Sequence, residues 1–393
     1  MVRIAVLAHN LRAGGGLVGT LNLLRALKSV SSTEQFFIIY PKGYGYEEIE
    51  LPADSKVYIY SGSHSLLQRS WFEAVSLPKI VRGFRPDVIC GLGNLGLSRP
   101  CARQAVLIHT PYFLYDNKHW PDARLTFRIR LAALRRQMAK SAAKTDLIFC
   151  QTPVMKMRFA ERFKYPADKI RLVRWPPPDE IMRSVGSMAP GVLDKSGGDL
   201  FVLLLTRYLP HRNPKVLIPL CSRYAPQLRQ QRIKFITTLD DETDVPSRAF
   251  LNETSRRGLG DIIVNAGPLS RQEVSRYMWH SDVLWLPTYM ETLCLPFLEA
   301  MSLGVPILAP DLDFARYVCG EAAVFYDPWD IDSAFAKIML LRQDSALRKV
   351  LAERGKIELA DRNRFSANWE EVAGDMLREL RRLAQQPNQG GAG

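Results

Sequence analysis

The stretch Leu284 to Asp311, LWLPTYMETLCLPFLEAMSLGVPILAPD, carries more chemistry than any other part of the chain. Its pattern predicts a buried strand, then a loop with Glu291, then a helix that starts around Pro296 and carries Glu299. Carboxylates accept hydrogen bonds from sugar hydroxyls, and free backbone N–H groups at the start of a helix bind phosphate. The two glutamates and the backbone of residues 292–295 therefore predict a site for a sugar linked to a diphosphate.

The rest of the chain repeats the same alternation of short apolar runs and amphipathic stretches. The expected strands of the first half are Ile4–Ala8, Phe36–Tyr40, Lys56–Tyr60, Asp87–Cys90, Gln104–Ile108, Asp146–Cys150 and Ile170–Val173. Those of the second half are Phe201–Thr206, Ile233–Thr238, Ile262–Val264, Val283–Leu286, Pro306–Ala309 and Ala323–Tyr326. Such alternation is typical of parallel sheets covered by helices, so we expect an α/β protein with two doubly wound sheets.

The break between the two halves lies in a segment rich in proline, glycine and serine. We expect a first doubly wound domain over residues 1–178, a linker over 179–198, a second domain over 199–365 and a disordered tail over 386–393. Ligands of such sheets bind at the carboxyl ends of the strands. We therefore expect the site in a cleft where the two domains face each other.

Composition excludes several classes of protein. With 47% hydrophobic and 24% charged residues, the chain is typical of folded globular proteins and not of fibrous or disordered ones. The six cysteines are scattered without a C-x-x-C pair, which predicts reduced, buried thiols and neither a zinc site nor a disulfide framework. No apolar run is long enough for a signal peptide or a spanning helix, so we expect a cytoplasmic protein.

The net charge of +13 indicates an anionic partner, which could be nucleic acid, a membrane surface or a phosphorylated substrate. We expect no nucleic acid, because no recognition motif with interleaved aromatic residues is present. Residues 123–145 hold seven basic side chains and no acid, with Phe127, Leu131, Leu134 and Met138 on one face of a helix. Such a helix can dock on anionic lipid at the inner membrane face; the alternative is a core-facing helix with solvated cations.

The segment ETLCLPFLEAMSLGVPILAPD, which starts at Glu291, resembles the E-G-F-G-L-P-x-L-E-A-M-A-x-G-x-P-V-V-A-S-D signature of the family 4 retaining glycosyltransferases. The likeness extends back through VNAGPLSRQEVSRYMWHSDVLWLP and forward through residues 313–328 and 365–369. It implies the GT-B fold of two facing Rossmann-like domains, with a closing helix over 366–385 that returns to the first domain.

The resemblance also implies an activity. Family members transfer a hexose from a nucleoside-diphosphate sugar to a hydroxyl of a sugar, glycan or lipid-linked acceptor, with retention of configuration and without a metal or other cofactor. Many such enzymes assemble surface polysaccharides or glycolipids. We therefore expect a transferase of this kind here, cytoplasmic and peripheral on the membrane.

The resemblance assigns roles to individual residues. Glu291 would bind hydroxyls of the donor sugar, and Glu299 would bind the ribose of the nucleotide. The donor phosphates would bind the backbone N–H groups of Thr292, Leu293, Cys294 and Leu295. Arg207 and Arg212 match two cations that grip the diphosphate, with Lys215 as the alternative. Thr292 and Cys294 stand where the family has glycines, which puts donor preference and loop geometry in question.

The first domain contributes a glycine run and a histidine. Gly14, Gly16 and Gly19 have the G-x-G-x-x-G spacing of a dinucleotide site, but five residues separate them from the first strand and no acid ends the next one. We interpret Gly14, Gly15 and Gly16 as the family's glycine-rich loop, which approaches the donor phosphate or the acceptor. His109 matches a family histidine near the donor sugar, although a histidine at a strand end can also be structural.

Two other interpretations stay open. A different GT-B enzyme, a sugar-nucleotide epimerase or a phosphorylase, would use water or inorganic phosphate in place of an acceptor. A non-catalytic basic protein that binds lipid or nucleic acid would not turn over nucleotide sugars. The spacings Asp311–Asp313 and Asp330–Asp332 resemble a D-x-D metal motif, but neither is set in a cluster of ligands, so we expect no metal.

Overall fold

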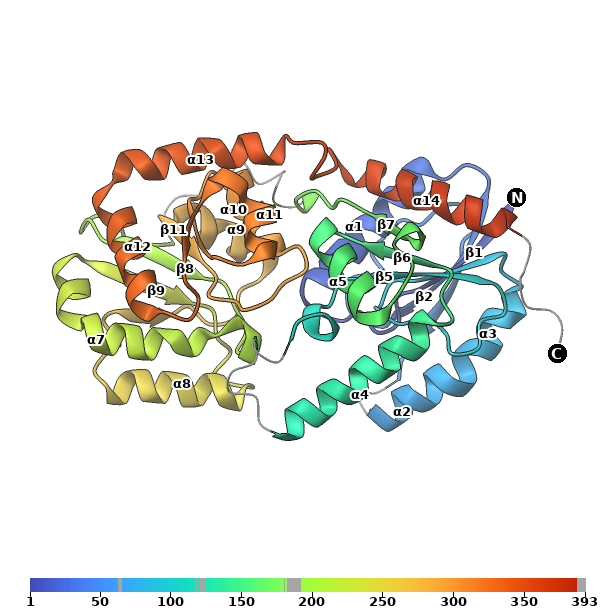
Figure 1. Cartoon of the computed structure of the whole chain (residues 1–393), viewed down its shortest axis with the longest axis horizontal. Coiled ribbons are helices and arrows are strands. Elements are labelled where there is room, and N and C mark those ends of the chain that lie inside the picture. The colour runs from blue at the N-terminus through green and yellow to red at the C-terminus, as the bar shows by residue number, and fades with distance from the viewer. Residues whose placement is uncertain (63–65, 117–118, 120–124, 180, 182–191, 387–393) are drawn as a thin grey trace. The chain divides into compact units, whose positions relative to one another are not determined.

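The computed structural model describes residues 1–62, 66–116, 119, 125–179, 181 and 192–386 (Figure 1). The chain separates into two compact units. Unit 1 consists of Met1–Tyr115, Arg124–Pro176 and Phe365–Gly393, and unit 2 of Asp116–Ala123 and Pro177–Arg364. Most of the expected linker and nearly all of the expected tail lie outside the described residues.

Unit 1 is built on a seven-stranded sheet with the order β3-β2-β1-β4-β5-β6-β7, in which all neighbouring strands are parallel. Its strands are β1 (Val2–Leu7), β2 (Glu34–Pro41), β3 (Lys56–Tyr60), β4 (Val88–Gly91), β5 (Arg103–Ile108), β6 (Leu147–Cys150) and β7 (Ile170–Leu172). Because the strands are parallel, the loops that follow them all lie at one edge of the sheet.

The helices of unit 1 are α1 (Gly14–Val30), α2 (Leu66–Trp71), α3 (Leu77–Phe84), α4 (Leu125–Ala142), α5 (Pro153–Phe163) and α14 (Trp369–Gln385). Helix α14 packs on α1, and the two buried rings of Trp175 and Trp369 lie 5.2 Å apart. A Cβ on Gly19 would overlap the ring of Trp175. The last glycine of the G-x-G-x-x-G spacing is thus required for packing in the core of unit 1.

Unit 2 is built on a six-stranded parallel sheet with the order β10-β9-β8-β11-β12-β13. Its strands are β8 (Leu200–Leu204), β9 (Ile233–Thr237), β10 (Ile263–Asn265), β11 (Val283–Trp285), β12 (Ile307–Pro310) and β13 (Ala323–Tyr326). Its helices are α7 (Leu217–Gln230), α8 (Val245–Arg256), α9 (Arg271–His280), α10 (Leu295–Leu303), α11 (Asp313–Cys319), α12 (Ile331–Gln343) and α13 (Ser345–Leu359).

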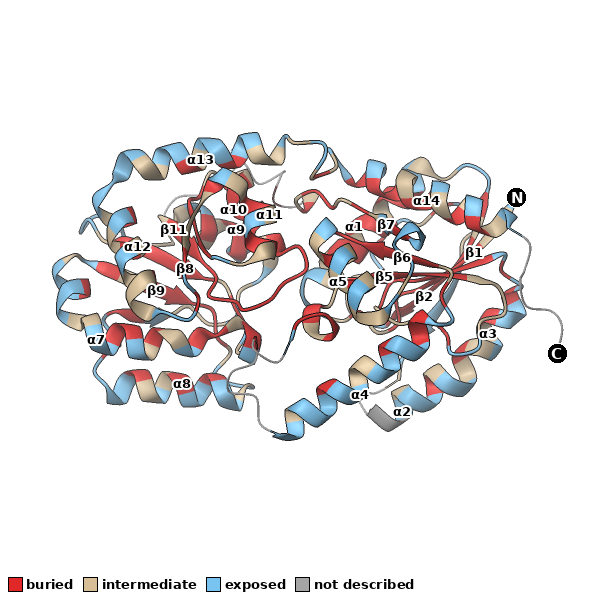
Figure 2. Ribbon diagram, in the orientation of Figure 1, coloured by how far each residue is buried: buried red, intermediate tan, exposed pale blue. Residues whose placement is uncertain are grey.

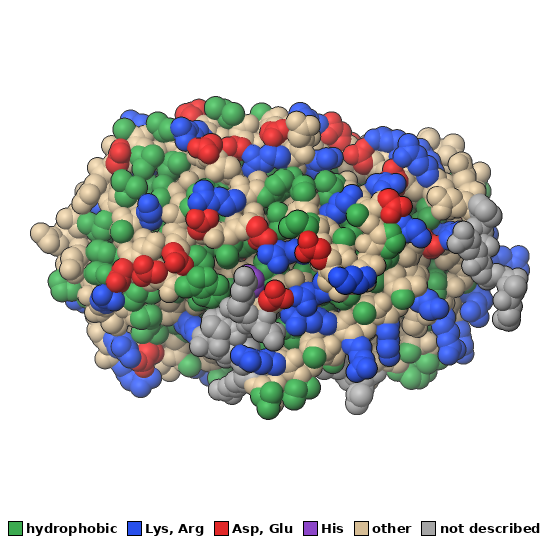
Figure 3. All heavy atoms as spheres, in the orientation of Figure 1, with side chains coloured by type: hydrophobic (Ala, Val, Ile, Leu, Met, Phe, Trp, Pro, Cys, Tyr) green, Lys and Arg blue, Asp and Glu red, His purple; other side chains and the backbone are tan. Residues whose placement is uncertain are grey.

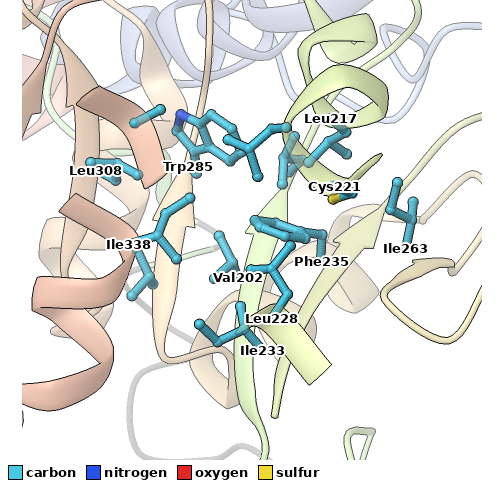
Figure 4. Close-up of a cluster of buried hydrophobic side chains, with 14 of the residues drawn as sticks. Val202, Leu217, Cys221, Leu228, Ile233, Phe235, Ile263, Trp285, Leu308 and Ile338 are labelled. Carbon is cyan, nitrogen blue, oxygen red and sulfur yellow. The ribbon is translucent and has the colours of Figure 1, made fainter. Parts of the chain in front are cut away.

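The cores explain why these segments form strands. Figure 2 shows most strands of both sheets buried and the outer faces of the helices exposed. The edge strand β3 is the exception, because four of its five residues are exposed. In unit 2, Val202, Phe235 and Trp285 project from neighbouring strands into one apolar cluster, which Leu217 and Ile338 complete from α7 and α12 (Figure 4). Apolar runs of four to six residues are therefore buried on both faces, as parallel sheets require.

The expected α/β architecture with two parallel sheets is confirmed. Every strand expected from the sequence coincides with an observed strand, with ends shifted by at most two residues. The closing helix is also present, as α14, and belongs to unit 1.

Candidate active site

The loop that precedes α10 has an unusual backbone. Cys294, the residue before the helix, has φ 57° and ψ 68°, in the left-handed region. The family has glycine there, and a side chain in this conformation costs of order 1 kcal/mol. Thr292 does not have a positive φ. One of the two glycine replacements is therefore strained and the other is not, while Pro296 lies in the first turn of α10 as expected.

Glu291 is buried in this loop and faces an arginine. Its Oε1 lies 2.9 Å from Nη2 of Arg212. Burial raises the pKa of the Glu291 carboxyl, although the Arg212 charge and the backbone N–H of Thr292 oppose that rise. The structure therefore brings together two residues that lie far apart in the sequence, as an ion pair whose carboxylate is buried.

The loop after β8 places Arg212. The carbonyl oxygen of His211 accepts hydrogen bonds from the Thr288 hydroxyl at 3.1 Å and from the Tyr289 backbone N–H at 2.8 Å. Asn213, which follows Arg212, has φ 50° and ends a short 3-10 turn. The loop after β8 is thus hydrogen-bonded to the loop that follows β11, and these bonds set Arg212 beside Glu291.

Glu299 lies one turn inside α10, and its side chain is 2% exposed. Its Oε1 accepts a hydrogen bond from Nη2 of Arg271 at 2.9 Å. Its Oε2 is buried and has no hydrogen-bond partner among the described residues. The carboxylate is therefore oriented by one arginine and has an acceptor left over for a ligand.

Sequence reasoning missed Arg271. It is the first residue of α9, whose start is fixed by a capping box between Ser270 and Glu273. The S-x-x-E pattern at these positions predicts a helix start, so the boundary of α9 could have been found. Nothing in the sequence shows that this helix start lies against α10.

The structure does not bring Arg207 to the two glutamates by any contact among the described residues. It lies three residues beyond the end of β8, and its side chain is exposed. The Thr243 hydroxyl chiefly lowers the pKa of Asp240, and the charge of Arg207 adds to that effect. Lys215 is exposed as well. Arg212, in contrast, is held beside a site carboxylate, that of Glu291.

In unit 1, Gly14, Gly15 and Gly16 lie in the first turn of α1. The sequence predicted a loop ahead of the helix, so this expectation is corrected. Gly14 has φ 68°, which favours glycine. A Cβ on Gly16 would overlap the ring of His109 at its Cε1–Nδ1 edge. The structure therefore joins two predicted site residues, Gly16 and His109, in direct contact.

His109 follows β5 at the same edge of the sheet. Its Nε2 lies 2.8 Å from the carbonyl oxygen of Leu92, which can only accept, so Nε2 carries the proton. Its backbone N–H donates to Oδ1 of Asn94 at 2.8 Å. Burial lowers the pKa of His109 to about 4, so the ring is neutral at physiological pH. Asn94, with φ 69°, is a positioning residue that the sequence did not reveal.

Helix α4 covers most of the basic stretch. Leu131 and Met138 are buried, and Phe127 and Leu134 are partly buried, so the apolar face expected from the sequence is confirmed. Figure 3 shows Lys and Arg side chains on the surface over α4. Ile129 is 61% exposed on this helix. Arg124 lies outside the described residues.

The D-x-D pairs have structural partners. Asp311 forms an ion pair with Arg316 at 2.7 Å, and Asp330 accepts from the backbone N–H of Asp332 at the start of α12. In the described part of the chain, no three acidic, histidine or cysteine side chains cluster as metal ligands would. Within the same residues, no helix has the length and apolar character needed to cross a membrane.

Two protein-family models match the chain, one in each half. The model of Glycosyltransferase Family 4 matches residues 13–175, and that of the glycosyl transferases group 1 matches residues 189–358. O-antigen chain mannosyltransferase B of Escherichia coli is 25% identical over 244 residues, which are 61% of this chain and 62% of that protein. The chain thus aligns with less than two thirds of the length of the curated relatives it matches.

Two solved structures share the architecture. WaaG, a glycosyltransferase involved in lipopolysaccharide biosynthesis, superposes with a TM-score of 0.70 at 15% identity over 95% of this chain and 99% of its own. Anabaena HepE in complex with UDP-glucose gives 0.67 at 13% identity, over 97% of this chain and 100% of its own. At these identities the likeness shows the fold. The two family models and this likeness together show that the chain belongs to the family 4 glycosyltransferases, whose second domain is the glycosyl transferases group 1 domain, and that it has their GT-B fold.

Proposed function

We propose that the protein is a retaining glycosyltransferase that moves a hexose from a nucleoside-diphosphate sugar to an acceptor hydroxyl. The observation that carries this proposal is the Glu299 carboxylate, buried and held by Arg271 with its second oxygen unsatisfied. A buried acceptor without a partner is costly, and a ribose hydroxyl would satisfy it.

The other groups of unit 2 fit the remainder of a nucleotide sugar. Glu291 would accept hydrogen bonds from donor-sugar hydroxyls. The backbone N–H groups of residues 293–295, at the start of α10, would bind the diphosphate, because a helix N-terminus favours negative charge. Arg212 and the exposed Arg207 would stabilise the charge that grows on the departing phosphate.

The proposed step needs only groups that the donor and this chain supply. The bond between the anomeric carbon and the phosphate oxygen breaks, and the bond to the acceptor oxygen forms on the same face. The proton of the acceptor hydroxyl passes to the departing phosphate. Neutral His109 would bind a hydroxyl of the donor sugar, and its contact with Gly16 would hold the ring in place. The proposal includes no metal or other cofactor.

The names of three similar proteins support the substrate class. The Escherichia coli relative is named as a mannosyltransferase of the O-antigen chain, and the Anabaena neighbour was solved with UDP-glucose. WaaG is described as acting in lipopolysaccharide biosynthesis. We therefore place this protein in the assembly of a surface polysaccharide or glycolipid, with a glycan, sugar or lipid-linked acceptor.

The test is turnover of a panel of nucleotide sugars that includes UDP-glucose and GDP-mannose. Release of free nucleotide should depend on one donor and an acceptor, and proton NMR of the product should show the anomeric configuration of the donor. An inverted product would contradict retention. Hydrolysis or epimerisation without an acceptor, or a requirement for inorganic phosphate, would point to a different GT-B enzyme. No binding of any donor would contradict the proposal as a whole.

We also propose that α4 docks the protein on anionic lipid at the cytoplasmic face of the membrane. Ile129 and Leu125 are 61% and 72% exposed, beside the exposed cations Arg128 and Arg130. Apolar side chains set among cations favour an anionic bilayer. Ile129→Asp should reduce sedimentation with phosphatidylglycerol vesicles, whereas Ile357→Asp, at a 70% exposed position of α13, should not. Equal sedimentation of both variants would contradict docking through α4.

A further inference from the structure

Unit 1 contains a second feature at the edge where its strands end, a pocket of about 240 Å³. The residues that line it are Arg12, Lys42, Tyr44, Tyr60, Ser61 and Gly62. They follow three neighbouring strands, β1, β2 and β3, at their carboxyl ends. The pocket thus lies at the edge of the sheet where doubly wound domains bind ligands. None of its residues belongs to the site described above.

Arg12 is held in the wall of this pocket. Its guanidinium lies 5.5 Å from the ring centre of Tyr60 and 5.8 Å from that of Tyr44. Its Nη2 donates to the carbonyl oxygen of Gly62 at 3.1 Å. An arginine stacked on two rings loses little further freedom when it binds a ligand, so it is preorganised for an anion.

Tyr60 supplies an unsatisfied polar group. The residue is 6% exposed, and its hydroxyl is buried without a hydrogen-bond partner among the described residues. A Cβ on Gly62 would overlap this hydroxyl. Glycine at that position therefore lets the backbone pack closely against this hydroxyl, which keeps a donor for a ligand oxygen.

The described residues that line the pocket include two cations, Arg12 and Lys42, and no acid. Two acids of unit 1 have partners of their own. Oε1 of Glu73 lies 2.8 Å from Nε of Arg69 and 3.2 Å from Nε2 of His9. Glu47 accepts from the backbone N–H of Gly43 at 2.8 Å.

Lys42 adds a second cation. It directly follows β2, and its backbone N–H donates to the carbonyl oxygen of Tyr60 at 3.1 Å. Its side chain is exposed and forms no ion pair within the described ranges. A planar guanidinium and a point-charge ammonium around one small space are a combination that suits phosphate.

We infer that this pocket binds a phosphate ester carried by the sugar acceptor. Arg12 and Lys42 would take the phosphate oxygens, the Tyr60 hydroxyl would donate to one of them, and the face of Tyr44 would pack on the sugar ring. The volume is below the ~300–1,000 Å³ of pockets for larger ligands, so it suits one sugar ring with its phosphate. This inference rests on the proposed transferase function and names its acceptor class.

The experiment measures binding of mannose 6-phosphate and glucose 6-phosphate to the full chain by calorimetry, without any nucleotide sugar. At least one hexose phosphate should bind more tightly than the uncharged hexose. Arg12→Gln and Lys42→Gln should each weaken that binding about tenfold, as expected for the loss of a charge-assisted contact. Lys79→Gln, which removes an exposed charge from α3 of the same unit, should not change it.

Three results would overturn the inference. Equal binding of the hexose and its phosphate would remove the role of the anion. Unchanged affinity in Arg12→Gln and Lys42→Gln would place the anion elsewhere. Loss of binding to phosphatidylglycerol vesicles in Lys42→Gln, with no hexose phosphate bound, would assign the pocket to a lipid phosphate instead.

The outcome is separable from that of the proposed function. Nucleotide binding should be the same in Arg12→Gln and the parent protein, because the groups proposed to bind the nucleotide belong to unit 2. In turnover assays, Arg12→Gln should raise KM for the acceptor and leave KM for the donor unchanged. Phosphate binding that depends on Arg12, in a protein that turns over no donor, would contradict the transferase and leave the pocket assignment standing.

Discussion

The two sheets present different chemistry at the edges where their strands end. In unit 2, Glu291 and Glu299 are buried carboxylates, each held 2.9 Å from an arginine. In unit 1, Gly16 lies against the neutral ring of His109. The same parallel topology therefore supports a charged site in one unit and an uncharged contact in the other. Topology fixes where the loops lie, and the loop residues fix what the edge can bind.

Glu291 and Glu299 also differ from each other in the origin of their arginine partners. They are eight residues apart, but Arg212 comes from the loop after β8 and Arg271 from the start of α9. Removing one partner of a buried ion pair leaves an uncompensated charge, which costs more than the pair contributes. The pairs are therefore suited to holding carboxylates in fixed orientations rather than to stabilising the fold.

The largest effect that we expect concerns the neutral ring of His109 in unit 1. The pKa of His109 is about 4 in the folded protein and 6.5 in the reference state, so the unfolded chain binds the proton more readily. Stability from this group is complete above pH 6.5 and is lost as the pH falls toward 4. The loss reaches about 3 kcal/mol, from about 1.4 kcal/mol for each unit of pKa difference.

Urea denaturation between pH 4 and 8 measures this loss. His109→Gln removes the titrating group, so its free energy of unfolding should fall less steeply below pH 6.5 than that of the parent protein. Above pH 7 the two curves should run parallel, which provides an internal control. Parallel curves over the whole range would show that His109 is not held neutral by burial.

The second prediction concerns the ion pair between Glu291 and Arg212 in unit 2. Glu291→Gln keeps the shape of the side chain but leaves Arg212 without its counter-charge, and the amide accepts hydroxyl hydrogen bonds less strongly. We expect kcat/KM to fall roughly a hundredfold, about 2.7 kcal/mol. Steady-state kinetics with the preferred donor would measure this fall.

The control for this variant is Glu353→Gln, which removes an exposed carboxylate of α13 paired with Lys356. It should retain the parent rate. Thermal unfolding of both variants would show whether a loss of activity reflects misfolding. Full activity in a folded Glu291→Gln protein would remove Glu291 from the site.

A third, smaller effect concerns the contact between Gly16 and His109. Gly16→Ala places a methyl group where the imidazole lies, so the ring or the first turn of α1 must shift. Overpacking of this kind costs about 1–3 kcal/mol, and we expect kcat to fall by about tenfold or more.

Gly83→Ala is the matched control for Gly16→Ala, because no heavy atom lies within 4 Å of the added carbon in α3. It should leave kcat unchanged and not lower the unfolding temperature. Equal kinetics for Gly16→Ala and Gly83→Ala would mean that the position of His109 has no part in turnover.

The smallest expected effect sharpens the account of the loop before α10. Cys294 has φ 57°, so glycine should be favoured over alanine there by about 1 kcal/mol. Both replacements remove the buried thiol, and their difference isolates the backbone term. Chemical denaturation of Cys294→Gly and Cys294→Ala would measure it, and a more stable alanine variant would contradict the left-handed conformation.

Much of the fold follows from local sequence. The apolar runs predicted the interior strands, because an interior strand of a parallel sheet must be apolar on both faces. Pro296 and Gly304 bound α10 as expected, since proline is tolerated in a first helical turn and glycine ends a helix with a positive φ. Gly14, Gly15 and Gly16 were assigned to a loop, whereas they lie in the first turn of α1. The exact start of this helix depends on packing.

The candidate site was predictable only in part. Glu291, Glu299 and Arg212 were proposed as site residues from the family resemblance, whereas Arg271 and Asn94 were not. Each of these two residues acts through a neighbour that is distant in sequence: Arg271 through Glu299, and Asn94 through the backbone of His109. Pairwise contacts of this kind leave no periodic or local pattern.

The sequence by itself determined two parallel sheets, the start and end of α10, which carries Glu299, and an excess of positive charge. Only the tertiary structure decided which arginine pairs with which glutamate, that Gly16 contacts His109, and that Arg12 and Lys42 share a pocket. The physical reason is that helix ends and buried strands leave patterns among neighbouring residues of the sequence. The edge of a sheet, in contrast, gathers loops whose residues meet only after the strands have paired.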